Sequence, residues 1–304
     1  METVLILIKQ VLIMYALMFI GFLAYKKKFL SDQGAKDIGK ILLNIVVVSV
    51  IISNLYVEKT PEKTVELLSS SFIALICMIL SIFISYLIFH KNNRIAEFAC
   101  SFSNAGFIGI PLAQATFGNH AVFYLTAMLV LVALLQWTYG VYTITDDKRY
   151  IDLKKVIRNP IVIAVIIGIV LYITQIKVPA IVTDLFEIIN SLNTPLAMFV
   201  SGVYLAQSDL LSMLKKKDVY FICLIRLIVI PLVIMLVFRF LPLGNNTIKL
   251  AVLLAGACPC GANVAIFAQQ YDCDYKKEIE YVCVSTLLSI LTIPLIIYLA
   301  TLFF

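Results

Sequence analysis

The stretch Ala99-Cys-Ser-Phe-Ser-Asn-Ala-Gly-Phe-Ile-Gly-Ile-Pro111-Leu-Ala-Gln114 decides how this chain folds, because it is an apolar run that carries its own interruption. The residues at its midpoint that break or polarise a helix are Asn104, Gly106, Gly109 and Pro111. Proline lacks a backbone donor and displaces a carbonyl about one turn earlier, while glycine lets the backbone leave helical geometry. The pattern returns late in the chain as Ala255-Gly-Ala-Cys-Pro259-Cys-Gly-Ala-Asn263. The sequence therefore predicts two helices that are broken near their middles.

The composition around these stretches is that of a membrane protein. Of 304 residues, 62% are hydrophobic and 14% are charged, and the mean hydropathy is +1.01. Soluble domains contain roughly 45–50% apolar residues, so a soluble fold could not bury this surface. A transmembrane helix needs about 20 apolar residues. We expect an all-α membrane protein with ten transmembrane helices, near residues 4–25, 38–57, 67–89, 96–117, 121–145, 161–176, 181–206, 220–240, 247–269 and 281–303.

Lys and Arg are shared unequally between the two sets of loops that alternate along the chain. These residues collect in cytoplasmic loops. The loops after helices 1, 3, 5, 7 and 9 hold sixteen of them, whereas the opposite loops hold five, namely Lys59, Lys63, Lys177, Arg239 and Lys249. This asymmetry predicts a multi-pass protein of the cell (plasma) membrane with both termini extracytoplasmic. Because the net charge of +6 follows from topology, no nucleic-acid partner is expected.

The two halves of the chain share short motifs at a nearly constant offset. Gly21-Phe-Leu-Ala-Tyr25 matches Gly168-Ile-Val-Leu-Tyr172 at an offset of 147, Leu43-Asn44 matches Leu192-Asn193 at 149, and Pro111 matches Pro259 at 148. Each half contains an odd number of helices, so the second half must enter the membrane from the opposite side. We therefore expect two inverted five-helix repeats, at residues 1–150 and 151–304.

The two interruptions form the candidate substrate site. Backbone groups freed in hydrocarbon cost several kcal/mol each unless they face protein, water or a ligand, and matching interruptions in both halves indicate a site at the membrane midplane. Half-helices that begin near Pro111 and Pro259 would direct their N-termini, each equivalent to about half a positive charge, at a bound carboxylate. The candidate substrate-binding residues are Asn104, Pro111, Gln114, Pro259, Asn263 and Arg226, and the candidate helix-breaking residues are Gly106, Gly109, Pro111, Pro259 and Gly261. A pair of packing kinks is the alternative, since Gly and Pro are common in membrane helices.

Few ionisable residues fall deep inside the apolar runs. Arg226 is the basic residue that does, and it could either attract anions or bind carbonyls freed by a broken helix. The acidic residues closest to the membrane interior are Glu97, Asp184, Glu187 and Glu280, all near helix ends, so no carboxylate is expected at the crossing. The coupling ion, proton or sodium, therefore stays open. His90, His120 and Cys258-Pro-Cys260 lack the further ligands that a metal site needs, and we expect no metal and no cofactor.

Five stretches, in this order and spacing, are similar to one known family. They are Ser103-Asn-Ala-Gly-Phe-Ile-Gly-Ile-Pro111, Arg158-Asn-Pro160, Pro195-Leu-Ala-Met-Phe-Val-Ser-Gly202, Arg226 with Pro231, and Pro259 with Gln269-Gln-Tyr271. Through them the chain resembles, essentially from end to end, the auxin efflux carrier family. That family includes plant auxin carriers of the PIN type and bacterial permeases thought to move dicarboxylates such as malate or malonate.

The resemblance implies the fold of the bile-acid sodium symporters. In that fold helices 1, 2, 6 and 7 form a scaffold domain, helices 3–5 and 8–10 form a moving core domain, and the broken helices 4 and 9 cross. The resemblance assigns substrate contact to Asn104 and the crossover to Pro111 and Pro259, and it implies a homodimer through scaffold helices. Plant carriers have a polar residue after Arg-Asn-Pro where this chain has Ile161, and the loop at residues 146–159 is short. A short bacterial-type member is therefore expected.

We expect the protein to be a secondary-active or facilitative transporter of small organic anions, working by alternating access in the lipid bilayer. The expected substrates are carboxylates, either a dicarboxylate such as malate or malonate or an auxin-like weak acid. An anion-binding membrane receptor or sensor without transport is the alternative. No enzyme is expected, because the apolar runs hold no activated nucleophile, buried acid pair or metal triad.

Overall fold

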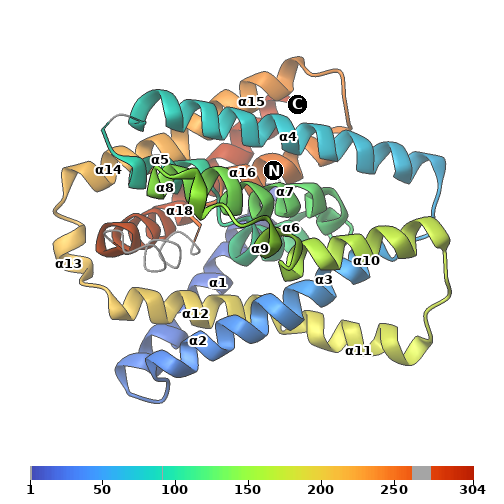
Figure 1. The fold of residues 1–304 in the computed structure, drawn as a ribbon, viewed down its shortest axis with the longest axis horizontal. Coiled ribbons are helices and arrows are strands. Elements are labelled where there is room, and N and C mark those ends of the chain that lie inside the picture. The colour runs from blue at the N-terminus through green and yellow to red at the C-terminus, as the bar shows by residue number, and fades with distance from the viewer. Residues whose placement is uncertain (1, 91, 262–274) are drawn as a thin grey trace.

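The computed structural model describes residues 2–90, 92–261 and 275–304, and this part of the chain is built from helices (Figure 1). The first half contains α1 (Glu2–Lys26), α2 (Asp32–Ile41), η1 (Leu42–Val46), α3 (Val47–Leu55), α4 (Pro61–Phe89), α5 (Arg94–Ser101), η2 (Ala105–Gly109), α6 (Ile110–Phe117), α7 (Ala121–Leu135), η3 (Gln136–Gly140), α8 (Val141–Thr145) and η4 (Lys148–Tyr150). The second half contains α9 (Leu153–Ile157), α10 (Pro160–Thr174), α11 (Ala180–Ser191), α12 (Asn193–Gln207), α13 (Leu210–Met213), α14 (Lys217–Leu224), η5 (Ile225–Val229), α15 (Ile230–Phe240), α16 (Asn246–Ala257) and α18 (Tyr275–Phe303).

Seven helical segments in the described residues are long and apolar enough to cross a membrane. They are Val4–Lys26, Asp32–Leu55, Pro61–Phe89, Ala121–Thr145, Ala180–Gln207, Lys217–Phe240 and Ile279–Phe303. A bent pair, Lys148–Ile157 with Pro160–Thr174, supplies an eighth if its two helices count as one span. The prediction of an all-helical, multi-pass membrane protein is thereby confirmed. Two shorter apolar helices, Ala105–Phe117 and Asn246–Ala257, lie in the two runs for which the sequence predicts interruptions.

Several helices start directly after a short polar residue that caps them. The Thr60 hydroxyl accepts a hydrogen bond from the backbone N–H of Lys63 at 3.2 Å, with Pro61 in the first turn of α4. The Asn159 side chain likewise accepts from the N–H of Ile161 at 2.9 Å, ahead of α10. Such side chains satisfy N–H groups that a helix leaves unpaired at its start, and proline fits there because it has no N–H to satisfy.

Several membrane helices contain a wide π-helical turn, and two of these turns precede a proline. Pro111 is the second residue of α6, directly after η2, and Pro231 is the second residue of α15, directly after η5. Inside an α-helix a proline ring would clash with the carbonyl about one turn earlier. A π turn changes the local hydrogen-bond spacing, so the helix can continue through the proline.

Glycines allow two pairs of helices to pack closely. Helix α1 packs along α12, and α10 packs along α3. A methyl group added to Gly202 of α12 would overlap the carbonyl oxygen of Met18 in α1, and one added to Gly21 would lie 2.6 Å from the carbonyl oxygen of Phe199. In the other pair, a methyl group on Gly168 would lie 2.5 Å from the side chain of Leu55. Small residues let membrane helices approach to backbone contact.

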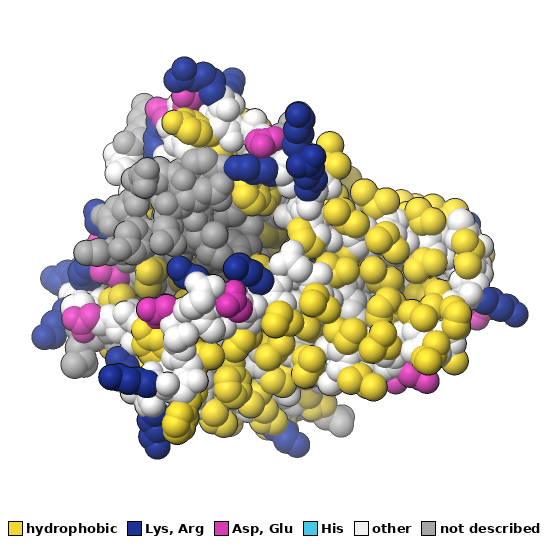
Figure 2. Space-filling model, turned by 60° about the horizontal axis from the view of Figure 1, so that its bottom comes forward, with side chains coloured by type: hydrophobic (Ala, Val, Ile, Leu, Met, Phe, Trp, Pro, Cys, Tyr) yellow, Lys and Arg dark blue, Asp and Glu magenta, His cyan; other side chains and the backbone are white. Residues whose placement is uncertain are grey.

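The helices separate into groups that are visible in Figure 1. Helices α2, α3, α10, α11 and α12 lie together at the bottom of that view, α4 and α15 lie at the top, and α5, α6 and α16 lie between them. Figure 2 shows a broad hydrophobic face with Lys and Arg side chains at its margins. Large apolar side chains such as Phe19, Phe83 and Leu291 are 59%, 55% and 72% exposed. Hydrocarbon is the surrounding in which such a surface is stable.

Candidate functional site

The first interruption lies at Phe102–Asn104. Helix α5 ends at Ser101, Phe102 takes an extended conformation, and helical structure resumes with η2 at Ala105. Asn104 caps the new start, because its side chain accepts from the N–H of Phe107 at 3.3 Å and its carbonyl accepts from the N–H of Ile108 at 3.1 Å. This capping geometry directs the N-terminus of a helix that runs to Phe117 toward the interruption.

The second interruption follows α16, and it pairs with the first. Helix α16 ends at Ala257, and the next residues form an isolated antiparallel bridge between Ser103 and Cys260. The N–H of Asn104 donates to the carbonyl oxygen of Pro259 at 2.9 Å, and the N–H of Gly261 donates to that of Phe102 at 3.0 Å. The two breaks therefore cross, and each satisfies backbone groups that the other frees.

Arg226 binds the carbonyl groups that the breaks release. Its side chain is 0% exposed and lies in η5. Nε donates to the Cys258 oxygen at 3.1 Å, Nη1 to the Cys100 oxygen at 2.9 Å, and Nη2 to the Gly256 oxygen at 2.6 Å. These oxygens lie at the C-terminal ends of α5 and α16, where helix geometry leaves carbonyls unpaired and the dipole is negative. Of the two roles that the sequence left open for Arg226, the structure shows the binding of freed carbonyls.

A cavity of about 60 Å³ adjoins the crossing. Both interruptions line it, together with η1, α3, α7, η3 and the start of α10. The lining residues are Leu43, Val47, Ser103, Asn104, Gly106, Phe107, Leu129, Val132, Ala133, Gln136, Trp137, Asn159, Ile161 and Gly261. Arg226 is not among them, so its assignment as a substrate-contacting residue finds no support in this geometry.

The cavity is lined by neutral hydrogen-bonding groups and by apolar side chains. Asn104 is 7% exposed, and Gln136 and Asn159 add two further amide side chains. A methyl group added to Gly106 would find nothing within 4 Å, so the backbone of the first turn of η2 borders open space. Amide N–H groups and the N-terminal N–H groups of a helix are suitable donors to an anion, and they bring no full positive charge into the membrane.

The structure corrects the expected position of the first half-helix. The sequence predicted its start near Pro111, whereas it begins at Ala105 and Pro111 lies inside helical structure. The π turn of η2 accommodates the proline, and the backbone leaves the helix where it can pair with the second interruption. Gln114 lies in α6, beyond Pro111, and does not line the cavity.

The other predicted residues fall into three groups. Asn104, Gly106 and Gly261 line the cavity, and Pro259 lies in the second break with its carbonyl bonded to Asn104. Gly106 and Gly109 lie in η2, where an added methyl group on Gly109 would lie 3.5 Å from the Cys258 sulfur. Asn263 lies outside the described residues, as do Gln269-Gln-Tyr271.

Gln136, Trp137 and Asn159 are among the lining residues that were not predicted as site residues. Gln136 is a buried polar residue in a long apolar run, and that was the signal that could have identified it. Trp137 contacts the Lys155 ammonium, whose Nζ lies 5.5 Å from the ring centroid. Asn159 belongs to a motif noted in the sequence, but a capping residue reveals a cavity only when the neighbouring helices are placed.

Comparison with known proteins gives matches over nearly the whole chain. The model of one family, described as membrane transport protein, matches residues 6–297. The chain is 23% identical to the uncharacterized transporter YfdV of Escherichia coli K12, over 94% of this chain and 95% of that protein. Proteins of the same name from Escherichia coli O157:H7 and Shigella flexneri match with the same identity and coverage. The family match spans both interruptions and Arg226.

Proposed function

Because the chain belongs to the membrane transport protein family, the family of the auxin efflux carriers, we propose that it is a secondary-active or facilitative transporter of small carboxylates that works by alternating access. The family is one of transporters and not of enzymes. The observation that carries the proposed substrate class is the crossing of two broken helices beside a cavity that Asn104 lines.

The chemistry of the cavity favours a small anion. The capped N-terminus at Ala105 is equivalent to about half a positive charge, and it acts in surroundings of low dielectric. The amides of Asn104, Gln136 and Asn159 can orient a carboxylate without binding it too firmly for release. Apolar neighbours such as Val47 and Leu129 suit a short hydrocarbon chain. Malate, malonate or an auxin-like weak acid combine these features.

Helix contacts support an architecture of ten spans in two inverted five-helix repeats, residues 1–150 and 151–304. When each helix is replaced by its counterpart in the other half, the contact of α1 with α12 corresponds to the contact of α10 with α3. In the same way, the contact of α5 with α18 corresponds to the contact of α16 with α7. The matched glycines Gly21 and Gly168 both lie at these helix contacts. In this architecture the scaffold comprises α1, α2, α3, α10, α11 and α12, and the remaining long helices form the core.

The charge asymmetry of the loops supports an orientation with both termini extracytoplasmic. In that orientation α8 reaches the cytoplasm at Thr145 and α10 starts from it at Pro160, so the cavity borders the cytoplasmic half of the protein. We infer that substrate reaches this cavity from the cytoplasmic side.

Transport and binding assays test this function. Purified protein in proteoliposomes is expected to accumulate at least one of malate, malonate or an auxin-like acid under imposed potential, pH or sodium gradients. Asn104→Ala is expected to weaken binding of that substrate at least about tenfold, because a buried hydrogen bond to a charged group contributes roughly 1.5–3 kcal/mol. Binding without flux would favour a receptor, and no binding of any carboxylate would overturn the proposal.

Filling the cavity should weaken substrate binding more than removing a single amide does. Gly106→Leu adds four carbon atoms where the backbone borders open space, so we expect it to weaken malate binding more than about tenfold while the protein still folds. Gly39→Leu is a matched control, because Gly39 in α2 also has nothing within 4 Å of an added methyl group but does not line the cavity. Equal binding by the two variants would remove this cavity from the transport path.

A further inference from the structure

Glu97 is a buried carboxylate in the helix that leads to the first interruption. Its side chain is 1% exposed, and its backbone carbonyl accepts from the Ser101 hydroxyl at 2.7 Å. Ser101 is the last residue of α5, so Glu97 lies about one turn from the break. From sequence this residue was expected near a helix end, but the structure encloses it in protein. A buried ionisable group in a membrane protein is costly and commonly has a functional reason.

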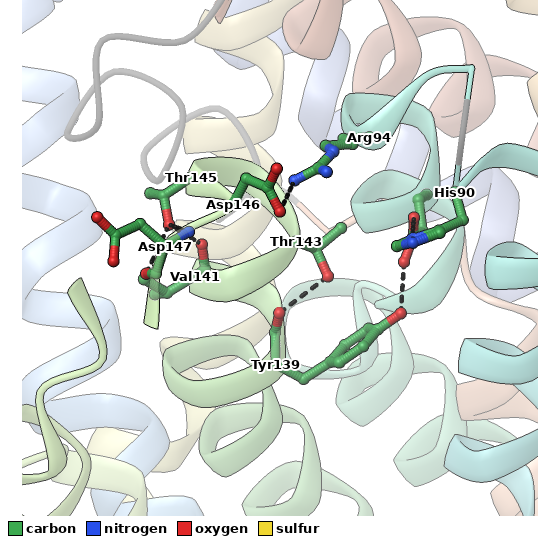
Figure 3. A network of polar contacts seen from close by, with 9 residues as sticks. His90, Arg94, Tyr139, Val141, Thr143, Thr145, Asp146 and Asp147 are labelled. Atoms are coloured by element: carbon green, nitrogen blue, oxygen red, sulfur yellow. Dashed lines mark hydrogen bonds and ion pairs between the residues drawn. The ribbon is translucent and has the colours of Figure 1, made fainter. Parts of the chain in front are cut away.

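Two titratable side chains contact the Glu97 carboxylate from neighbouring helices. The Tyr139 hydroxyl in η3 donates to Oε1, and Nδ1 of His90 at the end of α4 lies 3.2 Å from Oε2 (Figure 3). The His90 side chain is 32% exposed, and its ring stacks on that of Tyr86 with centroids 4.1 Å apart. A partly exposed imidazole that also contacts a buried carboxylate can pass a proton to it from outside the protein.

Other ionisable groups occur on every element packed against α5, and most of them already have partners. They are Arg94 on α5 itself, Tyr142 on α8 and Asp146 after it, Arg226 on η5, Asp218 and Cys223 on α14, and Lys277, Glu280 and Tyr281 on α18. The Arg94 guanidinium, 2.5 Å from Asp146, lowers the pKa of that carboxyl and keeps it ionised around neutral pH. Glu280 pairs with Lys216 at 2.6 Å, and the Tyr281 hydroxyl accepts from Asn93 at 3.3 Å. The direct side-chain contacts of Glu97 are a hydroxyl and an imidazole, and Arg94 adds a longer-range electrostatic interaction.

Glu97 is one of a small number of buried charged side chains. Within the described residues, the buried side chains with a formal charge are Glu97, Arg226, Lys249 and Glu280. Lys249 donates to the Leu241 carbonyl at 2.7 Å, near the other end of its helix from the crossing. Glu97 is one turn before Cys100, whose carbonyl accepts from Arg226. Glu97 and Arg226 are therefore the buried charged side chains that lie beside the first interruption.

We propose that Glu97 is a proton-binding site, reached from the cytoplasmic side through His90, and that an anion binding at the crossing takes up a proton on Glu97. This inference rests on the proposed function and adds the coupling ion to it. The carboxylate and the crossing are separated by a distance on the order of 10 Å along α5 and the break. Two negative charges at that distance in a protein interior disfavour each other by about tenfold in affinity, and by reciprocity the proton and the anion favour each other equally.

Malate binding by the purified full chain tests the proposal, because malate stays doubly ionised between about pH 6.5 and about pH 8. For the wild type we expect binding to be severalfold weaker at the higher pH, within the limit of about tenfold that the coupling sets. Calorimetry in two buffers of different ionisation enthalpy should show net proton uptake on binding. Glu97→Gln, which resembles the protonated acid, is expected to bind malate with less than about twofold change over the same range and without proton uptake.

Two further variants complete the design. Glu97→Asp retains a titratable group and should restore the pH dependence, whereas Glu280→Gln removes the other buried carboxylate and should leave the wild-type pH dependence unchanged. Proton uptake that persists in Glu97→Gln would overturn the proposal. Binding by the wild type that is independent of pH and takes up no proton would also overturn it, and this second measurement does not depend on whether a variant folds. Failure of the wild type to bind any carboxylate at either pH would instead overturn the proposed function itself.

Discussion

Replacing Arg226 by Met is expected to lower the free energy of unfolding by about 3 kcal/mol or more, because three buried carbonyl oxygens lose their donors at once. The carbonyls belong to Cys100, Gly256 and Cys258, so the ends of two half-helices are destabilised together. Arg226→Lys should recover only part of the loss, since one ammonium group cannot reproduce a planar fork of donors. Thermal unfolding in detergent, followed by the fluorescence of the single tryptophan Trp137, measures both effects.

Arg239→Met is the matched control for Arg226→Met. Arg239 lies at the exposed end of α15 and donates to the Phe303 carbonyl, so its replacement should change stability by less than about 0.5 kcal/mol. If Arg226→Met unfolded with the wild-type midpoint but no longer bound malate, the carbonyl contacts would be unimportant for stability. Attraction of anions would then be the role of this residue.

Gly202→Ala is expected to destabilise the protein by about 2 kcal/mol, against the usual preference of helices for alanine. The added methyl group overlaps the backbone carbonyl of Met18, and a backbone atom cannot rotate away as a side chain can. The helices α1 and α12 must then separate along a long contact. Thermal unfolding of the purified variant measures the change.

The control for Gly202→Ala reverses the sign of the effect. At Gly39 an added methyl group meets nothing within 4 Å, so Gly39→Ala should stabilise α2 by up to about 1 kcal/mol. Equal changes in stability in the two variants would mean that helix propensity determines the stability of both, and that α1 and α12 have room to adjust.

Apolar segments were predictable from sequence because hydrocarbon imposes a length and a composition that any single run must satisfy by itself. The run at residues 121–145 corresponds to the observed Ala121–Thr145, and the run at 220–240 begins three residues inside the observed Lys217–Phe240. The existence of two breaks was predictable for the same reason, since Gly and Pro act on their own helix.

The position of the first break was not predictable from local rules. Pro111 suggested a start about six residues too late, because the π turn of η2 lets the helix pass the proline. The actual break at Phe102–Asn104 depends on hydrogen bonds to Pro259 and Gly261, which are about 150 residues away in sequence. The same limit applies to Gln136 and Asn159, whose shared cavity exists only once helices from both halves are packed.

The antiparallel bridge between Ser103 and Cys260 also constrains how this chain can change in evolution. Each interruption supplies the hydrogen bonds that make the other tolerable in hydrocarbon. A mutation that made one of the two helices continuous would leave the peptide groups of the other break without hydrogen-bond partners. No second mutation in the same helix could restore those partners. The two irregular segments must therefore persist together or disappear together, although separate halves of the chain encode them.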